Sequence, residues 1–445
     1  MTALPTAMLD RLSRRRPLPA YLALGAVLIA GIGLRMVWLE DMEYKADESW
    51  TWRNAKAAAD TQAVPWVGMP SSAGVENPGI SLWAFIPLAR LSENPVDLAR
   101  GVAWLSIAAI VAWIVFACQM PPGEREHWLW AAALWAVNPL SVLHYRKIWP
   151  NSLYPLLIVM LLVCWRQRER RAMAFAWGML GSIVTQINLS AGFFSLAFVL
   201  WAWLADRRRV AWRSWFGGSV LASLPLVPWF YFLQTESTQP SQATFRPARL
   251  FECKFLTRWL TEPLGFGLDH ALGEDYVDFL RQPLIGGVPT WLVALLHAAA
   301  LALGLVLVWQ WFRARRGQPF DWREEFFPRS YGGVVCSAAF WGYGTLLTLT
   351  CLPLHRHYMI VVYPIELLWV AQLAVDVHRD NPARLAIGRK LLVGLVCVQF
   401  FLSAGFLGYV HTKGAIDGDY GIALSAQRRQ HALANPPAAR QTAVR

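Results

Sequence analysis

Apolar stretches recur along the chain from Tyr21 to Val410, and short arginine-rich breaks separate them. A helix that crosses a bilayer needs about 20 mainly apolar residues, so stretches near this length are typical of transmembrane helices. They comprise residues 21–39, 102–118, 128–143, 153–165, 212–233, 289–312, 331–352, 358–377 and 391–410. Residues 172–205 are too many for one helix, and we expect a helical hairpin that turns near Asn188. The pattern predicts an all-α polytopic membrane protein, a bundle of about ten or eleven transmembrane helices.

The positions of the charged residues predict the orientation of these helices. Arg11, Arg14, Arg15 and Arg16 precede the first stretch, and positive residues favour the cytoplasmic side, so we expect residues 1–20 to be cytoplasmic. We then expect an N-terminal transmembrane module at 21–233 with an external loop at 40–78, an external loop at 234–288, C-terminal transmembrane helices at 289–410 and an external, partly disordered tail at 411–445.

One short apolar stretch decides whether this topology is consistent. If every stretch crossed the membrane, one arginine-rich gap would lie on the wrong side. We therefore interpret residues 80–91, which are too few to cross, as a re-entrant or juxtamembrane helix. A shortened or tilted span elsewhere is the alternative.

The composition excludes several classes of protein. Hydrophobic residues make up 56% of the 445 residues, charged residues only 16%, and 25 residues are tryptophan, which excludes an ordinary soluble protein. The net charge of +12 comes from arginines between the spans, where they set topology, so it does not indicate nucleic-acid binding. The six cysteines show neither a CxxC motif nor Cys/His ligand spacing, so neither a disulfide framework nor a zinc cluster is indicated. The first stretch is too long for the core of a removable signal peptide.

Three groups of polar residues fall at span ends on the predicted external side: Asp47 and Glu48; His144, Tyr145, Arg146 and Lys147; and His355, Arg356, His357 and Tyr358. Arginine and lysine can neutralise a phosphate, histidine and tyrosine can donate to it, and a carboxylate can take a proton from a hydroxyl. Each group also has a plainer interpretation. The acidic pair can belong to a solvated loop, Arg146 and Lys147 can snorkel to lipid headgroups, and the histidine group can be an interfacial turn. It is their co-occurrence that favours a site for an anionic lipid.

A further acidic stretch lies near the end of the chain. Asp417 and Asp419 stand between Gly414 and Gly421 and suggest a calcium loop at first sight. The other ligand positions of such a loop are missing, so we interpret the stretch as a turn.

In order and spacing, these motifs resemble the GT-C class of integral-membrane glycosyltransferases, which use polyprenyl-phosphate sugars and include protein O-mannosyltransferases and aminoarabinose transferases. The resemblance rests on Ala46-Asp47-Glu48, Asn77-Pro78-Gly79-Ile80, Leu98-Ala99-Arg100-Gly101, Asn138-Pro139, His144-Tyr145-Arg146, Leu153-Tyr154-Pro155, Tyr358 and Pro364. Two positions depart from the pattern: His357 stands where the family usually has arginine, and Gly79 stands where it has a second proline. The chain also ends soon after its last predicted span, whereas some relatives carry a large soluble C-terminal domain. We expect any contribution of such a domain to the acceptor site to come from elsewhere or to be absent.

The resemblance implies a helical bundle whose two external loops carry juxtamembrane helices, and a set of site residues. Asp47 would be the general base, and Glu48 would orient the acceptor or Asp47, or would hold a divalent cation if one is used. Arg356, His357, Tyr358, Arg146 and Lys147 would bind the donor phosphate, and His144, Tyr145, His355 and Asn77 would bind substrate. No residue is assigned as a metal ligand.

The implied reaction is the inverting transfer of one hexosyl or pentosyl group from a polyprenyl-phosphate donor to a hydroxyl of a lipid, polysaccharide or protein. The partners would be these substrates and membrane lipids, with no nucleic acid. We expect a bacterial inner membrane, with the site on the periplasmic side and residues 234–288 covering the acceptor.

Two other classes stay open. A transporter or lipid flippase would place ionisable groups within its spans, whereas the charges here cluster at span ends, and no internal repeat is visible. A non-catalytic component of surface-polysaccharide assembly would keep the spans without needing the Asp-Glu pair.

Overall fold

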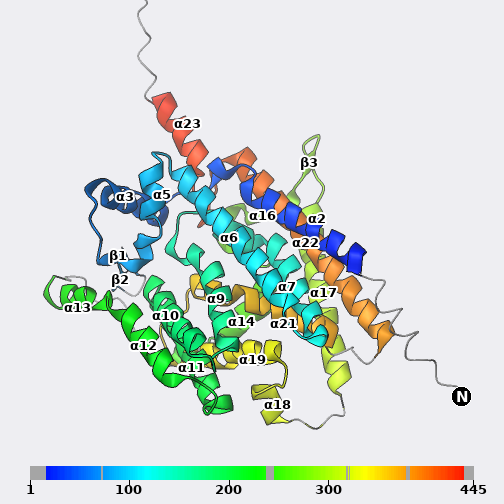
Figure 1. Ribbon diagram of the computed structural model, residues 1–445. Helices are drawn as coiled ribbons and strands as arrows, with labels where there is room; N and C mark the ends of the chain where they lie inside the picture. The colour runs from blue at the N-terminus through cyan, green and yellow to red at the C-terminus, as the bar shows by residue number, and fades with distance from the viewer. Residues whose placement is uncertain are drawn as a thin grey trace, which may run out of the picture.

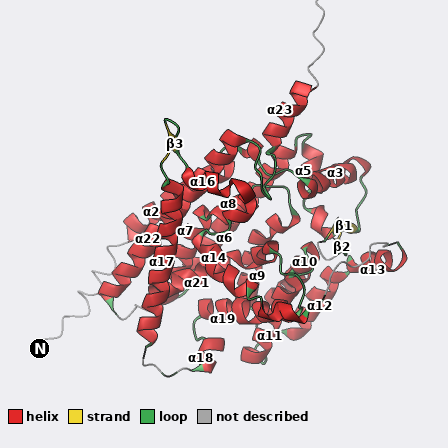
Figure 2. Ribbon diagram, turned by 180° about the vertical axis from the view of Figure 1, so that it is seen from behind, coloured by secondary structure: helices red, strands yellow, loops and turns green. Residues whose placement is uncertain are grey.

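The computed structural model describes residues 17–71, 74–236, 245–316, 319, 321–376 and 381–434 (Figure 1). These residues are almost entirely helical, and their strands form two small hairpins (Figure 2). The four N-terminal arginines and residues 435–445 of the predicted tail lie outside the described residues.

The first half of the described chain contains α2 (Pro17–Met36), η1 (Leu39–Asp41), α3 (Ala46–Thr61), β1 (Val67–Pro70), β2 (Glu76–Pro78), α4 (Ile80–Trp83), α5 (Ile86–Leu91), α6 (Pro95–Cys118), α7 (Pro122–Val137), α8 (Pro139–His144), η2 (Pro150–Leu153), α9 (Tyr154–Arg166), α10 (Arg171–Ile187), α11 (Ala191–Asp206), α12 (Trp212–Ser223) and α13 (Leu226–Thr235). Strands β1 and β2 pair antiparallel, with Val67 opposite Pro78 and Pro70 opposite Glu76. This hairpin follows α3 directly and so lies in the first predicted external loop.

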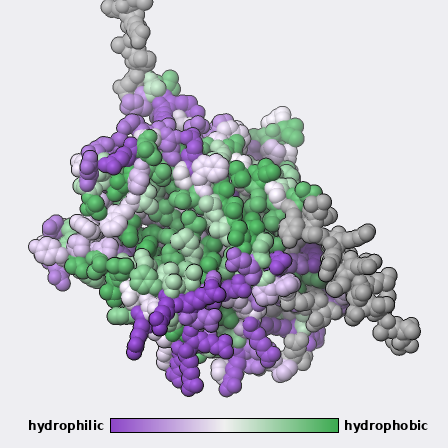
Figure 3. Space-filling view, viewed as in Figure 1, coloured by the Kyte–Doolittle hydropathy of each residue, from purple (hydrophilic) through white to green (hydrophobic). Residues whose placement is uncertain are grey.

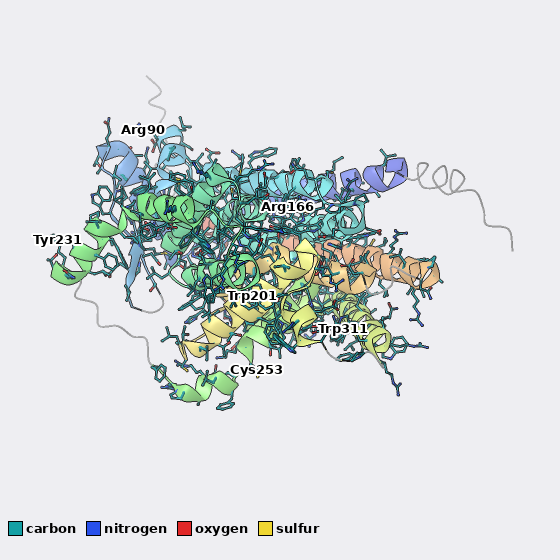
Figure 4. All side chains as sticks on the ribbon, turned by 60° about the horizontal axis from the view of Figure 1, so that its bottom comes forward. Arg90, Arg166, Trp201, Tyr231, Cys253 and Trp311 are labelled. Atoms are coloured by element: carbon teal, nitrogen blue, oxygen red, sulfur yellow. The ribbon has the colours of Figure 1, made fainter. Side chains whose placement is uncertain are left out.

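The second half contains η3 (Pro247–Phe251), α14 (Lys254–Thr261), η4 (Glu262–Leu264), α15 (Leu268–Leu272), η5 (Gly273–Asp275), α16 (Tyr276–Arg281), β3 (Leu284–Ile285), β4 (Val288–Pro289), α17 (Leu292–Arg315), α18 (Trp322–Phe326), α19 (Tyr331–Ser337), the π-helical turn η6 (Ala338–Tyr343), α20 (Gly344–Leu349), η7 (Arg356–Val362), α21 (Tyr363–Val375), α22 (Pro382–Lys413) and α23 (Leu424–Ala434). The described part of the predicted loop at 234–288 is therefore a series of short helices. One of them, α14, buries Phe255 and Trp259 against the core, whereas Tyr231 and Cys253 are exposed at the margin of the molecule (Figure 4).

Five described helices are long and apolar enough to cross a membrane: Pro95–Cys118, Leu292–Arg315, Tyr331–Leu349, Arg356–Val375 and Pro382–Lys413. The pair α12 and α13, bent by 49°, makes a sixth if it is one span, and four apolar helices are shorter. Apolar side chains form a band across one face, with hydrophilic side chains above and below it (Figure 3). The protein is therefore an integral membrane protein, while the count of ten or eleven spans stays a prediction.

One predicted span is broken in the structure. Residues 128–143 do not form a single helix, because α7 ends at Val137 and α8 begins at Pro139. Asn138 between them caps α8, since its side-chain oxygen accepts hydrogen bonds from the backbone N–H groups of Leu140 (3.0 Å) and Ser141 (3.1 Å). Proline at the first helical position needs no hydrogen bond of its own.

The predicted hairpin near Asn188 is confirmed. Helix α10 ends at Ile187, α11 begins at Ala191, and the Asn188 side chain accepts a hydrogen bond from the Ser190 N–H at 3.1 Å. The arginine-rich gaps on either side of the hairpin meet at one end of the bundle, where Arg168 pairs with Asp206 at 3.3 Å.

The described part of the predicted C-terminal tail is ordered and packed. Helix α22 runs on to Lys413, and two β-bridges follow, Ala415 with Ile422 and Glu43 with Ala423. Helix α23 lies at the same end of the molecule as α3 and α5, and α18 lies at the opposite end (Figure 1). The tail therefore returns to the acidic segment near the start of the chain.

Candidate active site

Helix α3 positions the acidic pair. Its first turn contains Asp47 and Glu48, and Glu48 accepts a hydrogen bond at 3.1 Å from the backbone N–H of Lys45, the residue before the helix. Carboxylates are favourable in a first turn because they satisfy free N–H groups and complement the helix dipole. The two acids then separate: Glu48 is fully buried, while Asp47 remains half-buried at a cavity.

This cavity has a volume of about 260 Å³ and gathers residues from distant parts of the chain. It is lined by Asp47, Met69, Pro70, Ser71, Asn77, Trp149, Pro150, Asn151, Ile187, Asn188 and His357. Three predicted site residues, Asp47, Asn77 and His357, therefore share one hollow. The volume lies just below the range of about 300–1,000 Å³ that is usual for small-molecule sites.

The hairpin of β1 and β2 supplies one wall. Asn77 donates from Nδ2 to the Met69 carbonyl at 2.9 Å, while its Oδ1 is buried without a hydrogen-bond partner among the described residues. Next to this pair, the Gly79 N–H donates to the Trp66 carbonyl at 2.8 Å, and a Cβ at Gly79 would lie 1.9 Å from the Pro65 carbonyl oxygen. The departure from the family pattern at Gly79 thus has a physical reason, since proline would clash and would lose the hydrogen bond.

A buried charge network lies behind Asp47. Lys147 Nζ lies 2.8 Å from Glu43 Oε2 and 3.4 Å from Glu48 Oε1, and Lys45 Nζ lies 2.8 Å from Glu43 Oε1. Burial raises the pKa of Glu48 to about 7, although the Lys147 charge opposes this. Burial alone would lower the pKa of Lys147, but Glu43 and Glu48 outweigh it and raise that pKa above its usual value. Lys147 thus stays charged, and one ammonium serves two carboxylates.

The same charges act on Asp47. Burial raises its pKa above the usual value, and Lys147 and Lys45 partly offset this rise. A half-buried carboxylate with a raised pKa at a cavity is suited to accept a proton.

Aromatic rings form the wall opposite Asp47. The Trp149 and His357 rings meet edge to face with centroids 5.6 Å apart, and His355 stacks on His357 at 5.4 Å. Lys147 Nζ lies 4.5 Å from the centroid of the Trp149 ring. His144 lies 6.0 Å from Trp149, and both of its ring nitrogens are buried without a hydrogen-bond partner among the described residues. Buried polar groups without partners indicate a place where water or a ligand completes the hydrogen bonds.

Arg356 lies next to this wall but does not line the cavity. Its Nε donates to Glu262 Oε1 at 2.9 Å and its Nη1 donates to the Gly267 carbonyl oxygen. Glu262 is fully buried, and burial raises its pKa to about 7 against the opposing charge of Arg356. Tyr358 places its ring edge to face with His357 at 4.5 Å, behind the cavity wall.

Two predicted site residues have structural positions instead. Arg146 caps the C-terminal end of α2: its guanidinium donates to the carbonyl oxygens of Leu34 at 3.1 Å and Trp38 at 2.9 Å, and it is almost fully buried. Tyr145 is fully buried in the core. Neither side chain lines the cavity, and Glu48 faces the buried charge network. Their roles at the site stay predictions.

Several residues of the site were not predicted. Asn188 was singled out only as a hairpin turn, and Trp149 and Asn151 flank a proline just after a predicted site group. Glu43, four residues before Asp47, could have been found from the local excess of acids. Glu262 gives no signal in the sequence, because only the fold brings it to Arg356.

Within the described part of the chain, no group of three His, Cys, Asp or Glu side chains is arranged to hold a metal ion.

No family model matches the chain, and no curated protein matches it. Among solved structures, the Archaeoglobus fulgidus oligosaccharyltransferase tethered to an acceptor peptide with the NVT sequon matches with a TM-score of 0.50 and 13% identity, over 88% of this chain and 56% of that chain. The chain has the fold of a GT-C membrane glycosyltransferase. The apo form of that enzyme matches with a TM-score of 0.43 and 13% identity, over 86% and 55% of the two chains. Archaeal AglB with an inhibitory peptide and a dolichol-phosphate matches with a TM-score of 0.46 and 12% identity, over 85% and 55%.

Proposed function

We propose that the protein is a membrane glycosyltransferase that moves one hexosyl or pentosyl group from a polyprenyl-phosphate donor to a hydroxyl-bearing acceptor, on the external face of a bacterial inner membrane. The observation that carries the proposal is the cavity that Asp47 and His357 share on a GT-C fold. The acceptor would be a lipid, a polysaccharide or a protein.

The reaction would proceed by inversion at the anomeric carbon. The Asp47 carboxylate accepts the proton of the acceptor hydroxyl while the hydroxyl oxygen attacks that carbon. The bond between the carbon and the phosphate oxygen breaks, and its electron pair leaves with polyprenyl phosphate. His357 and the unpartnered ring of His144 would donate to the phosphate, and the Arg356 guanidinium beside them would balance its charge.

The decisive assay gives purified protein in liposomes a panel of labelled polyprenyl-phosphate sugars and measures released polyprenyl phosphate. We expect Asp47→Asn to abolish release without affecting membrane insertion. Asp60→Asn is a matched control, because it makes the same change on the same helix at an exposed position. Near-full activity of Asp47→Asn would remove Asp47 as the base.

Measurements of donor affinity distinguish the role of Arg356 from that of Asp47. We expect Arg356→Ala to weaken donor binding more than Asp47→Asn does, because only the former removes a positive charge near the phosphate. Equal donor affinity in the two variants, measured by displacement of a fluorescent polyprenyl phosphate, would contradict this assignment.

One observation favours a lipid flippase as the second candidate. Glu366 lies within the span Arg356–Val375, and both of its carboxylate oxygens are buried without a partner among the described residues. The expectation that the spans are almost free of ionisable groups therefore has an exception, of the kind found along transport pathways. Two results together would establish this alternative. The wild type would move labelled polyprenyl phosphate across liposome membranes without releasing sugar, and the Glu366→Gln variant would not move it.

A further inference from the structure

Residues 414–423, which we call the C-terminal strap, join α22 to α23. The strap pairs with the segment before α3 through the bridge of Glu43 with Ala423. Directly after it, the Leu424 N–H donates to the Met42 carbonyl at 3.2 Å. The turn expected from sequence is thus a packed part of the site's surroundings.

One side chain of the strap reaches the start of α3. Lys45 Nζ lies 2.9 Å from Asp419 Oδ1 and also donates to the Asp419 carbonyl oxygen. On its other side it pairs with Glu43. Because Lys45 immediately precedes α3, this contact fixes the position of the first helical turn, where Asp47 lies.

The strap also contacts the predicted external loop at residues 234–288. The backbone N–H groups of Asp419 and Tyr420 donate to the carbonyl oxygens of His270 (3.2 Å) and Ala271 (2.9 Å). A Cβ at Gly418 would lie 2.3 Å from the carbonyl carbon of Leu272, so this close approach requires glycine. Nearby in the same loop, Asp269 Oδ1 lies 3.8 Å from Arg356 Nη1. The strap therefore connects the segment that carries Asp47 with the segment that contacts Arg356.

We propose, on the basis of the glycosyl transfer proposed above, that Asp419 is a positioning residue for Asp47, which it acts on through Lys45. The strap holds α3 in register with residues 267–275, so that the base and the phosphate-binding wall face the same cavity.

Electrostatics distinguishes this role from a merely structural one. The charged and titratable groups that face Asp47 come from its own segment, from the turn after α8, from the strap and from the opposite wall: Glu43, Lys45, Glu48, Lys147, Asp419 and His357. Burial is the main cause of the raised pKa of Asp47, Lys45 lowers that pKa and Asp419 raises it. Removing Asp419 should therefore lower the pKa of Asp47, and removing Lys45 should raise it.

The test measures kcat/KM for polyprenyl phosphate release against pH, using the full chain in liposomes. We expect the acid limb to move to lower pH in Asp419→Asn and to higher pH in Lys45→Gln. On the pH-independent plateau, both variants should lose up to about fivefold in kcat/KM. This factor corresponds to the loss of an exposed ion pair that contributes about 1 kcal/mol. Asp417→Asn is the matched control, since its exposed side chain makes no ion pair within the described residues.

The outcomes separate the two proposals. Release by the wild type, with acid limbs that stay in place or move in the same direction in both pair variants, would overturn the role of Asp419 alone. Absence of release by the wild type would overturn the proposed function and this role with it. Because Asp419 is 52% exposed, we expect Asp419→Asn to unfold at the wild-type temperature. This measurement checks that the variant is folded.

Discussion

Replacing Lys147 by methionine tests whether one ammonium neutralises two buried carboxylates. Lys147 Nζ lies 2.8 Å from Glu43 Oε2 and 3.4 Å from Glu48 Oε1, and these side chains are 4% and 0% exposed. Methionine keeps the length of the side chain and removes the charge. Removing one member of a buried ion pair costs about 3–5 kcal/mol, because the partner charge stays buried. We expect Lys147→Met to lower the free energy of unfolding by about this amount at pH 8.

Glu48 gives this prediction a pH dependence. Its pKa is raised from 4.5 to about 7, chiefly by burial, so the folded protein binds a proton that the unfolded chain releases in that window. The contribution of Glu48 to stability therefore falls as pH rises from 4.5 to 7, by about 3 kcal/mol for a shift of this size. Without Lys147 the pKa of Glu48 rises further, since a neighbouring positive charge is lost. The deficit of Lys147→Met should thus shrink as the pH is lowered.

The assay is denaturant unfolding in detergent, followed by tryptophan fluorescence between pH 5 and pH 8. Glu48→Gln is the matched control, because glutamine mimics the protonated acid and should cost little at pH 8. It should also remove the part of the pH slope that Glu48 contributes, while Glu262, whose pKa is likewise raised to about 7, keeps its own part. Two results would refute the reasoning: a Lys147→Met protein as stable as the wild type at pH 8, or a deficit that grows as the pH falls.

Three further predictions concern other parts of the site. Arg146→Gln should lower the free energy of unfolding by about 2–3 kcal/mol through lost charged hydrogen bonds and leave the KM for the donor unchanged; a raised KM would restore the phosphate-binding role. Gly79→Ala should lower the unfolding temperature because its Cβ would lie 1.9 Å from a backbone oxygen, whereas Gly25→Ala, with nothing within 4 Å, should not. Donor binding near pH 7 should be accompanied by uptake of a proton by Glu262. A phosphate that draws the Arg356 charge away from Glu262 raises the pKa of this acid further. Calorimetry in buffers of different ionisation enthalpy would detect this uptake, and its persistence in Glu262→Gln would exclude Glu262.

The sequence predicts what depends on local pattern and fails where distant segments meet. The helices and the hairpin at Asn188 follow from the length and spacing of apolar stretches. The break at Asn138 also has a local cause, a capping residue before a proline, which the apolar count over residues 128–143 hid. The position of Arg146 could not be predicted, because a cation at a span end has the same sequence signal whether it faces a ligand or caps a helix. Only the fold distinguishes these, by placing the end of α2 beside it.

The charges around the cavity explain why acid and phosphate chemistry would stay on opposite walls. On the α3 side, the carboxylates of Glu43, Asp47 and Asp419 outnumber the ammonium groups of Lys45 and Lys147, and Asp419 also lies 3.8 Å from His270 Nε2, so a phosphate placed there would be repelled. On the other side, Arg356 is paired with the carboxylate of Glu262, whose pKa is raised by burial to about 7, so that at neutral pH this acid neutralises the arginine only in part. Asp269, whose Oδ1 lies 3.8 Å from Arg356 Nη1, offsets part of this charge from an exposed position. Under the proposed function, the remaining positive charge would attract the donor phosphate. The carboxylates around Asp47 and the guanidinium of Arg356 thus lie on separate segments of the chain, and the strap connects these segments because it contacts Lys45 on one side and residues 270–272 on the other.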